Sequence, residues 1–409
     1  MSRTMLCPPG FLWGTAISAH QSEGNNSNSD CWLAEHVSPS IFKEPSGDAC
    51  DSFERYDQDI ALAAELGFNC HRFGIEWARI EPEPGAFSQS ALDHYARVLT
   101  ACRDHGLAPV VTFSHFTVPR WFAARGGFEQ ADGADLFARF ADRAARALGP
   151  LMHAATTFNE ANIGRLLPFL PGRAEARPIT EAMIAACAKA SGSDRFSSIL
   201  FADQDRILPV MVDAHDKASA AIKAVRSDLP VGLTLTMQDI QGVGEGHIAE
   251  TVIDLLYGPW LDVARRSDFI GVQTYSRVLV GSQGPLPLPQ DAERTAAGYE
   301  FYPQAIGGTI RFAHERIGKP IWVTENGIAT NDDARRIAYI DQALDEVAQC
   351  IADGIDVRGY IHWSLLDNYE WVHGYAQRFG LVDVDFTTFK RTAKPSGRHL
   401  GAIARANCL

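Results

Sequence analysis

The amino-acid sequence predicts an α/β protein of the (β/α)8, or TIM, barrel class. Eight short runs rich in β-branched and aromatic residues alternate with amphipathic segments of helical length. No linker, low-complexity tract or second apolar core interrupts this alternation. Because eight strands, each followed by a helix or a helix-sized segment, close a parallel barrel, we expect residues 1–409 to form a single domain.

The N-terminal half contains the first four strand-like runs. They cover residues 11–17, 68–77, 108–113 and 154–158. After each of the first three runs, apolar side chains recur at steps of three and four, as in Tyr56 and Ile60, and this spacing predicts a helix. The fourth run is followed by a long segment without a clean strand, of which residues 210–225 have a helical pattern.

The C-terminal half repeats the pattern with four more strand-like runs. They cover residues 231–236, 269–275, 321–324 and 357–363. A proline-rich loop, residues 281–289, follows the sixth run, and helical spacing returns at Ile306 and Ile310. The seventh run stops at Glu325, where an Asn-Gly pair turns the chain. We therefore expect Glu325 at the C-terminal tip of a buried strand.

A doubly wound open sheet is the alternative to a barrel. That fold needs no eighth strand and usually has a glycine-rich first turn that holds a pyrophosphate. The first turn here, residues 18–21, reads Ser-Ala-His-Gln and cannot hold a pyrophosphate in that way. A glycine-rich stretch at residues 242–246 lacks the Lys-Ser/Thr of a P-loop and the full dinucleotide fingerprint. We therefore expect a barrel without a cofactor.

Composition and charge exclude several classes of function. The 37 basic and 50 acidic residues give a formal charge of −13, which argues against a nucleic-acid partner or an anionic membrane surface. The eight cysteines form no Cys-x-x-Cys pair, so neither a metal knuckle nor a redox motif is indicated. No signal-like segment follows Met1, and no apolar run is long enough to cross a bilayer. We expect a cytoplasmic protein, and its oligomeric state stays open.

Polar and aromatic residues gather where the predicted strands end, and in a barrel these ends form the active site. Along the chain they are Gln21, Arg72, Glu76, His115, Asn159, Glu160, Tyr275, Glu325 and Trp363, followed in the last loop by Glu370, Trp371 and Phe379. Neither the ligand spacing of a metal site nor a Gly-x-Ser-x-Gly elbow is present, so we expect no metal and no serine nucleophile.

Two carboxylates in this set, Glu160 and Glu325, each end a strand-like run. A lone glutamate after a strand is usually a solvated loop residue, whereas two on the strand tips of one barrel can face each other across a substrate. Aromatic faces stack on the C–H faces of sugars, while amides and carboxylates bind hydroxyl groups. The combination points to a glycoside substrate.

Six sequence blocks resemble the signatures of glycoside hydrolase family 1, the β-glucosidase family. They lie within residues 11–24, 72–80, 157–160, 293–303, 324–327 and 363–381. Each block alone is weak evidence, but the matches follow the order of the family from residue 11 to about residue 395. The resemblance implies an enzyme with a catalytic (β/α)8 barrel and a small-molecule β-glycoside as its substrate.

The resemblance implies a retaining mechanism with two different roles for glutamate. Glu325 attacks the anomeric carbon, and Glu160 protonates the leaving oxygen and later deprotonates the water that releases the sugar. In such pairs the carboxyl groups lie roughly 5–5.5 Å apart. Arg72, for which an ion pair with Glu76 is the alternative, and Tyr275 are expected to favour the ionised form of Glu325, whose charge then raises the pKa of Glu160.

The resemblance also implies which side chains hold the first sugar. The side chains that bind hydroxyl groups are Gln21, Glu370 and Trp371 for the outer hydroxyls, His115 for the 3-hydroxyl and Asn159 for the 2-hydroxyl. The aromatic side chains that line the site are Trp363, as the stacking floor, and Phe379. Glu76 is interpreted as structural.

Four positions depart from the family and leave the sugar and aglycone preference open. The family usually has Trp, Asn, Tyr and Pro at the positions of Phe116, Gln273, Thr274 and Ala161. Residues 173–207 also fit the family poorly. None of these differences removes a group that the reaction itself requires.

Several activities remain open within this interpretation. The favoured one is hydrolysis of terminal β-D-glucosyl residues, with β-galactosyl and β-fucosyl residues as further substrates. Transglycosylation uses the same residues, whereas a non-catalytic sugar-binding barrel would have lost a carboxylate. A 6-phospho-β-glucosidase needs cationic donors in the last loop, where Gln377 stands in place of Lys and an anionic Glu370 would repel a phosphate. Arg378 is expected beneath the Phe379 turn.

Overall fold

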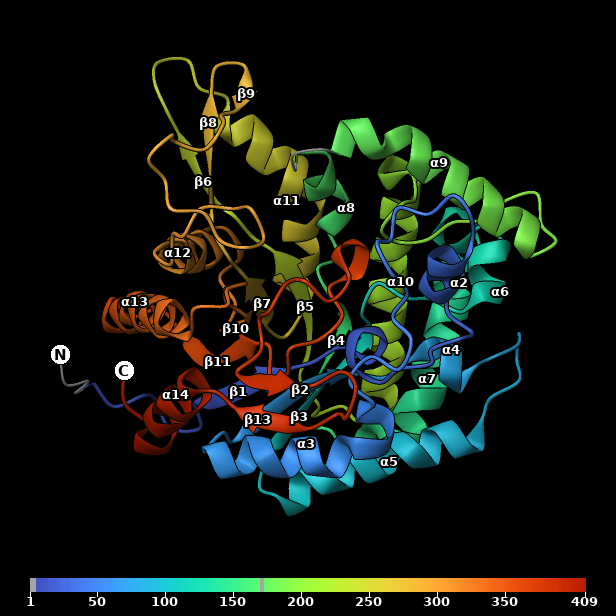
Figure 1. Ribbon diagram of the computed structural model, residues 1–409, viewed down its shortest axis with the longest axis horizontal. Coiled ribbons are helices and arrows are strands. Elements are labelled where there is room, and N and C mark those ends of the chain that lie inside the picture. The colour runs from blue at the N-terminus through green and yellow to red at the C-terminus, as the bar shows by residue number, and fades with distance from the viewer. Residues whose placement is uncertain (1–4, 170–172) are drawn as a thin grey trace.

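The computed structural model describes residues 5–169 and 173–409, and a closed barrel of parallel strands lies at its centre (Figure 1). The barrel strands are β1 (Leu12–Ala16), β2 (Cys70–Gly74), β3 (Ala108–Ser114), β4 (Ala154–Phe158), β5 (Val231–Thr236), β7 (Ile270–Gln273), β10 (Ile321–Glu325) and β11 (Val357–Trp363). Around the barrel they follow the order β1-β11-β10-β7-β5-β4-β3-β2. The predicted eight-stranded (β/α)8 barrel is confirmed.

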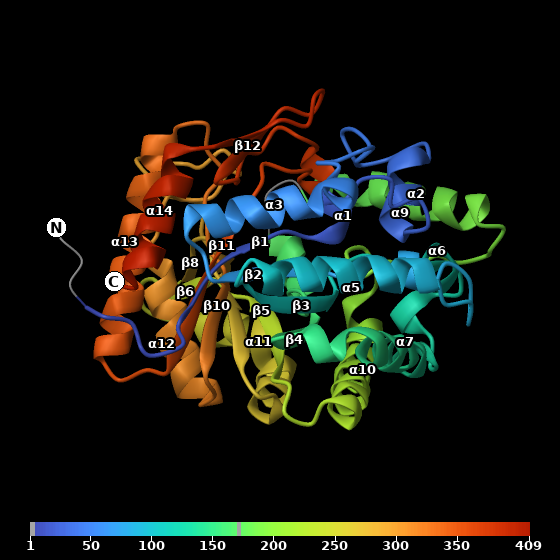
Figure 2. The same ribbon diagram turned by 90° about the horizontal axis from the view of Figure 1, so that it is seen from below.

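A helix follows each barrel strand and packs on the outside of the barrel (Figures 1 and 2). These helices are α3 (Ser52–Leu66), α5 (Gln89–Asp104), α7 (Gly133–Leu148), α10 (Gln204–Val225), α11 (Ala249–Arg266), α12 (Ala305–Ile317), α13 (Asp333–Ala352) and α14 (Pro395–Ala406). Their apolar faces bury aromatic rings against the strands. Phe137 of α7, for example, stacks on Phe158 of β4 with ring centroids 4.6 Å apart. This layer forms most of the hydrophobic core.

Further helical elements lie in the loops that connect the strands and helices. They are α1 (Ala19–Ser22), α2 (Asp30–His36), α4 (Trp77–Ile80), α6 (Arg120–Ala124), α8 (Ile163–Leu166) and α9 (Arg173–Ala190), with 3-10 turns η1 (Gly127–Glu129), η2 (Gly149–Leu151), η3 (Leu167–Phe169) and η4 (Trp371–His373). The strand expected over residues 68–77 ends at Gly74 because Glu76 begins a helix. The Glu76 carboxylate accepts a hydrogen bond from the N–H of Ala78, as an N-cap of α4 does.

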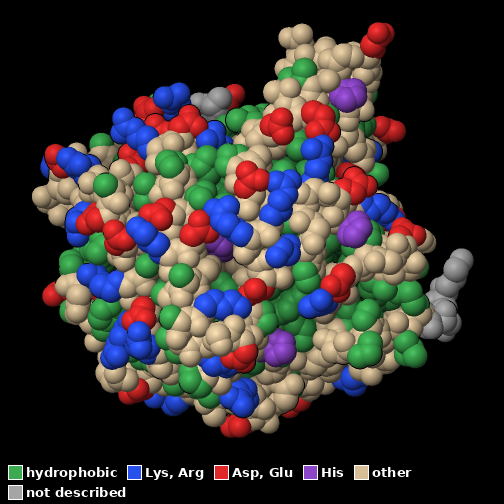
Figure 3. Space-filling model, turned by 180° about the vertical axis from the view of Figure 1, so that it is seen from behind, with side chains coloured by type: hydrophobic (Ala, Val, Ile, Leu, Met, Phe, Trp, Pro, Cys, Tyr) green, Lys and Arg blue, Asp and Glu red, His purple; other side chains and the backbone are tan. Residues whose placement is uncertain are grey.

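Two small sheets that the sequence pattern did not predict complete the fold. One contains β6 (Asp239–Gly242), β8 (Arg277–Gly281) and β9 (Gly284–Pro285), and the other pairs β12 (Val382–Val384) with β13 (Arg391–Ala393). The first sheet projects from the body of the molecule near α11, at the top of Figure 1 and at the top right of Figure 3. The strand expected over residues 269–275 is shorter in the structure, because barrel strand β7 ends at Gln273 and β8 begins only at Arg277.

The parallel barrel places the C-terminal ends of its strands, where the predicted site residues lie, at one rim. Glu325 of β10 is paired in register with Gln273 of β7, and Phe158 of β4 is paired with Ser114 of β3. Residues that end or directly follow these strands therefore lie at the same C-terminal rim. No helix among the described residues combines the length and apolarity that crossing a membrane requires.

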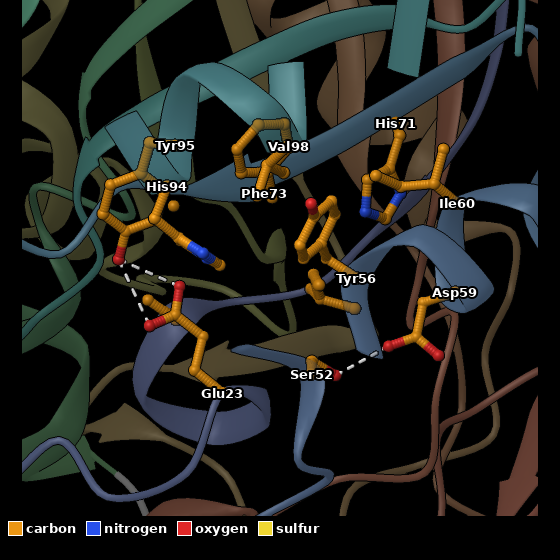
Figure 4. A pocket seen from close by; sticks show the side chains of 13 residues that line it. Glu23, Ser52, Tyr56, Asp59, Ile60, His71, Phe73, His94, Tyr95 and Val98 are labelled. Carbon is orange, nitrogen blue, oxygen red and sulfur yellow. Dashed lines mark hydrogen bonds between the residues drawn. The ribbon is translucent and has the colours of Figure 1, made fainter. Parts of the chain in front are cut away.

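A small internal cavity lies outside the barrel, between α3, α5 and β2 (Figure 4). Tyr56, His71 and His94 contribute to its lining, and beside it the hydroxyl of Tyr95 donates a hydrogen bond to Glu23 at 3.0 Å. Its volume is about 30 Å³, which is room for water but not for a sugar. The cavity is therefore no candidate for the substrate site.

A buried ion pair connects β13 to α3 and provides a test of the fold. Arg391 donates from Nε to Oδ1 of Asp59 at 2.7 Å, and both side chains are 1% exposed. Removing one member of a buried pair leaves an uncompensated charge, which costs about 3–5 kcal/mol. We expect Arg391→Ala to lower the free energy of unfolding by about 3–5 kcal/mol. The variant should therefore unfold at a lower midpoint urea concentration than the wild type when unfolding is measured by circular dichroism.

The exposed pair Arg358–Asp356 offers a matched control. Its nitrogen–oxygen distance is also 2.7 Å, but its side chains are 55% and 54% exposed. Exposed pairs contribute only about 0–1 kcal/mol, so Arg358→Ala should leave the midpoint almost unchanged. Equal midpoints for the two variants would contradict a stabilising role for the buried pair.

Candidate active site

The carboxylate of Glu325 ends β10 and is held by two donors. Arg72 of β2 donates from Nη1 to Oε1 at 2.6 Å, and the hydroxyl of Tyr275 donates to Oε2 at 2.7 Å. Arg72 therefore pairs with Glu325 rather than with Glu76. Glu325 is 4% exposed and Arg72 is 1% exposed, so both oxygens of this carboxylate are fixed in a site that largely excludes water.

Glu160 follows β4 and has an unusual backbone conformation. Its φ is +42°, in the left-handed region that residues other than glycine rarely adopt. Its N–H donates to the hydroxyl of Thr234 on β5 at 3.1 Å, and the N–H of Ala161 donates to the Thr234 carbonyl at 3.1 Å. These bonds to the neighbouring strand hold Glu160 at the barrel rim, where it is buried.

The two glutamates titrate differently because their partners differ. Burial, followed by the negative charge of Glu325, raises the pKa of Glu160 well above its usual range. Burial also raises the pKa of Glu325, but Arg72 and Tyr275 oppose that rise. Glu160 therefore keeps its proton at a pH at which Glu325 is ionised. Burial is a larger cause of the raised pKa of Glu160 than the charge of Glu325, which is the cause expected from the sequence.

Asn159 joins Arg72 to strand β7. Its Oδ1 accepts hydrogen bonds from Nη2 of Arg72 at 2.5 Å and from Nε2 of Gln273 at 2.9 Å. These two donors fix the orientation of the Asn159 amide, so its NH₂ group points away from Arg72 and Gln273. Gln273, which stands where family members usually have Asn, reaches Asn159 with its longer side chain, while its own Oε1 is buried without a partner.

Gln21 and Glu370 lie together although they come from opposite ends of the chain. Nε2 of Gln21 donates to the Tyr369 carbonyl at 2.8 Å and to Oε2 of Glu370 at 3.2 Å. Burial and then the charge of Glu325 raise the pKa of Glu370 to about 8. Much of Glu370 is therefore protonated at neutral pH, which corrects the expectation of an anionic side chain. A neutral carboxyl group can both donate to and accept from sugar hydroxyls.

Two of the predicted aromatic residues, Trp363 and Trp371, pack with His115 as near-parallel rings. His115 stacks on Trp363 with centroids 5.6 Å apart, and on Trp371 with centroids 6.3 Å apart. Phe116 meets the edge of Trp371 at 5.2 Å, so the position that usually holds Trp in the family does belong to this group. Burial, and then the charge of Arg72, lower the pKa of His115 well below its usual range, which leaves the imidazole neutral.

Tyr299 is a residue of the site that the sequence argument did not single out. Its ring lies 6.2 Å from Tyr275, which also meets Phe379 edge to face at 5.9 Å. Its hydroxyl is buried without a hydrogen-bond partner, and burial, then Tyr339, Glu370 and Glu160, raise its pKa well above the usual range. Tyr299 lies in an irregular loop, and only its place within the block of residues 293–303 could have indicated it.

Two charged residues near the rim have structural partners instead. The Glu76 carboxylate accepts hydrogen bonds from Asn26 and Thr117, each at 2.8 Å. Arg378 lies 3.5 Å from Asp367, which also pairs with Lys394 at 2.7 Å. Lys394 is thus tightly paired, whereas Nη1 of Arg378 makes no hydrogen bond. Among residues 5–169 and 173–409, no group of three His, Cys, Asp or Glu side chains could hold a metal ion.

Comparison with known proteins identifies the family. The sequence pattern described as Glycosyl hydrolase family 1 matches residues 3–238 and 267–408. The chain belongs to glycosyl hydrolase family 1. Beta-glucosidase A of Thermotoga maritima is 28% identical to it over 98% of both chains. A bifunctional beta-D-glucosidase/beta-D-fucosidase of Bifidobacterium breve is 28% identical over 96% of this chain and 97% of its own.

Solved structures of similar proteins have the same fold. The apo structure of a beta-glucosidase designated 1317 superposes with a TM-score of 0.96 at 49% identity, over 98% of this chain and 99% of that one. The beta-glycosidase BGL167 superposes with a TM-score of 0.94, also at 49% identity, over 98% of each chain. Family 1 is a retaining family, and retention needs one carboxylate that attacks and one that carries a proton.

We infer that Glu325 is the nucleophile and Glu160 the acid/base, and the order of their pKa values then predicts a bell-shaped dependence of kcat/KM on pH. As the pH falls through the pKa of Glu325, this carboxylate gains a proton and can no longer attack. As the pH rises through the pKa of Glu160, the acid is lost. With 4-nitrophenyl β-D-glucoside, Glu160→Gln should keep the acidic limb and lose the alkaline one. Glu370→Gln is the matched control, because it removes the neighbouring carboxyl group and should keep both limbs. An alkaline limb that survives in Glu160→Gln would assign that limb to another group.

Proposed function

We propose that this protein hydrolyses terminal non-reducing β-D-glucosyl residues of β-glucosides with retention at the anomeric carbon. The observation that carries the proposal is the unequal environment of two buried glutamates. Arg72 and Tyr275 bind Glu325, whereas burial and the charge of Glu325 raise the pKa of Glu160. An ionised carboxylate beside a protonated carboxyl group is the pair that double displacement requires. The names of the relatives support the same class of substrate.

The first step forms a covalent glycosyl-enzyme. A carboxylate oxygen of Glu325 attacks the anomeric carbon as the bond from that carbon to the leaving oxygen breaks. Glu160 gives its proton to the leaving oxygen, so that a neutral alcohol departs. Arg72 and Tyr275 hold the attacking carboxylate in one orientation through its two oxygens.

The second step releases the sugar. Loss of the negative charge on Glu325, now an ester, removes one cause of the raised pKa of Glu160, which by then is a carboxylate and can act as a base. Glu160 takes a proton from water while the water oxygen attacks the anomeric carbon. The bond to Glu325 breaks, and both carboxyl groups return to their starting protonation states.

The family resemblance implies the sugar-binding roles, and the environments of Asn159 and His115 support two of them. The amide of Asn159 is oriented by Arg72 and Gln273 so that its NH₂ group can donate to the 2-hydroxyl. Neutral His115 can bind the 3-hydroxyl, while Gln21 and Glu370 bind the outer hydroxyls. Trp363 forms the stacking floor. A β-fucoside lacks the 6-hydroxyl but keeps the 2- and 3-hydroxyls, so it is the second substrate to examine.

The nucleophile can be identified by trapping. A 2-deoxy-2-fluoro-β-glucoside with an activated leaving group should glycosylate Glu325 and stay attached, because the fluorine slows both steps and the activated leaving group restores only the first. Peptide mass spectrometry should find the label on the peptide that contains Glu325. Glu325→Gln should be unlabelled and almost inactive, since no other group can replace the nucleophile. A label on Glu160 or Glu370 would overturn the assignment.

The plain sugar should be preferred to its 6-phosphate. Lys394 pairs with Asp367 at 2.7 Å, and Arg378 lies 3.5 Å from the same carboxylate, so Asp367 offsets the charge of the cations near this loop. The partly protonated Glu370 repels a phosphate less than a full carboxylate would, so the pairing of these cations with Asp367 is the stronger argument. The measurement is kcat/KM for 4-nitrophenyl β-D-glucoside, β-D-fucoside and β-D-glucoside 6-phosphate under identical conditions. A higher value for the phosphate would refute the proposed substrate class.

A further inference from the structure

The indole of Trp371 packs on a buried histidine that comes from the other end of the chain. The rings of His20 and Trp371 are stacked, with centroids 5.5 Å apart and planes 12° from parallel. Trp371 begins the single turn η4 and has a φ of +47°. A single turn has few backbone hydrogen bonds of its own, so the orientation of this ring depends on what packs against it.

His20 is itself fixed by a carboxylate from α2. Its Nε2 donates to Oε1 of Glu35 at 2.7 Å, and both side chains are fully buried. The second oxygen of Glu35 accepts hydrogen bonds from the N–H of Ser46 at 2.9 Å and from the Ser46 hydroxyl at 2.7 Å. On the other side of the imidazole, Asn26 lies 3.2 Å from Nδ1. The ring therefore has one defined orientation.

The charges around His20 favour its protonated form. Burial opposes that form, but the carboxylates of Glu35, Glu76 and Asp30 outweigh it and raise the pKa of His20. Burial likewise opposes the ionised form of Glu35, but His20 and then Ser46 lower its pKa. The imidazole packs on the indole face, and its protonated form adds a cation–π attraction to this contact.

Residues 44–46, to which Glu35 is hydrogen-bonded through Ser46, also contact the chain on both sides of Trp371. The hydroxyl of Tyr369 donates to the carbonyl of Glu44 at 2.8 Å, and the N–H of Tyr375 donates to the carboxylate of Glu44 at 2.9 Å. The hydroxyl of Tyr375 also donates to the carbonyl of Ser46. Glu35 is thereby connected to Trp371 by two routes, one through His20 and one through residues 44–46.

We propose that His20 and Glu35 are positioning residues that hold Trp371 against the first sugar. Neither is assigned a contact with the substrate or the reacting atoms, and their effect passes through the indole. The inference rests on the proposed β-glucosidase function, since it concerns the sugar site of that reaction. When a side chain contacts the sugar equally in the ground state and in the transition state, loss of that contact changes KM more than kcat. Loss of His20 should therefore weaken sugar binding while the chemical step continues.

The test is a double-mutant cycle between His20 and Trp371. The variants are His20→Gln, Trp371→Phe and the double variant, each measured for kcat and KM with 4-nitrophenyl β-D-glucoside and for inhibition by deoxynojirimycin. We expect His20→Gln to raise KM and the inhibition constant roughly tenfold, the loss of one cation–π contact and its packing, with kcat changed less than about threefold. In the Trp371→Phe background, the same change should alter both constants less than about twofold.

Two further variants separate positioning from general stability. Glu35→Gln keeps the size of the side chain but removes its charge, and it should raise KM in the same direction as His20→Gln. His399→Gln breaks a more exposed His–carboxylate pair, with Asp341 at 2.8 Å, on helices α13 and α14, and should leave KM and kcat unchanged. Thermal unfolding of each variant shows whether it is folded at the assay temperature.

The outcomes are distinct. An equal effect of His20→Gln with and without Trp371, or an unchanged KM in folded His20→Gln, would overturn the positioning role. So would a loss of kcat at constant KM. Failure of the wild-type protein to hydrolyse any β-glucoside would instead refute the proposed function, so the two failures are distinguishable.

Discussion

The buried ion pair between Arg72 and Glu325 is the interaction on which the geometry of the site depends. Removing two charges from water costs several kcal/mol per ion unless good geometry and further hydrogen bonds compensate. Here the compensation comes from separate strands, because Arg72 belongs to β2, Asn159 follows β4 and Glu325 ends β10. These charges have their full set of partners only when the barrel is closed. The geometry of the candidate active site therefore depends on closure of the barrel.

The fold and the two central glutamates could be predicted because their signals are local. Apolar runs and helical spacing mark the strands and helices, and Glu160 and Glu325 each lie where such a run ends. The small sheet formed by β6, β8 and β9 could not be predicted in the same way, since its strands are short and partly within a proline-rich loop. Strand β2 ends early because a polar side chain, Glu76, caps the helix that follows.

Properties that depend on three-dimensional neighbours could not be predicted from sequence. The protonation of Glu370 is set by burial and by Glu325, and neither is visible in the residues around it. Tyr299 lies in an irregular loop, where no strand tip marks it. The pairing of His20 with Glu35 requires α2 to pack beside α1, and spacing alone does not indicate it. The sequence left two possible partners for Arg72, and only the structure shows that Arg72 pairs with Glu325 and not with Glu76.

Three residues around the sugar site, Phe116, Glu160 and Trp371, have positive φ values of +73°, +42° and +47°. Backbone strain of this kind costs about 1–3 kcal/mol per residue, and Glu160 adds the cost of a buried acid beside Glu325. Selection for stability alone would favour glycine at position 160, which relaxes the backbone and removes the acid. Activity and stability therefore place opposite demands on position 160.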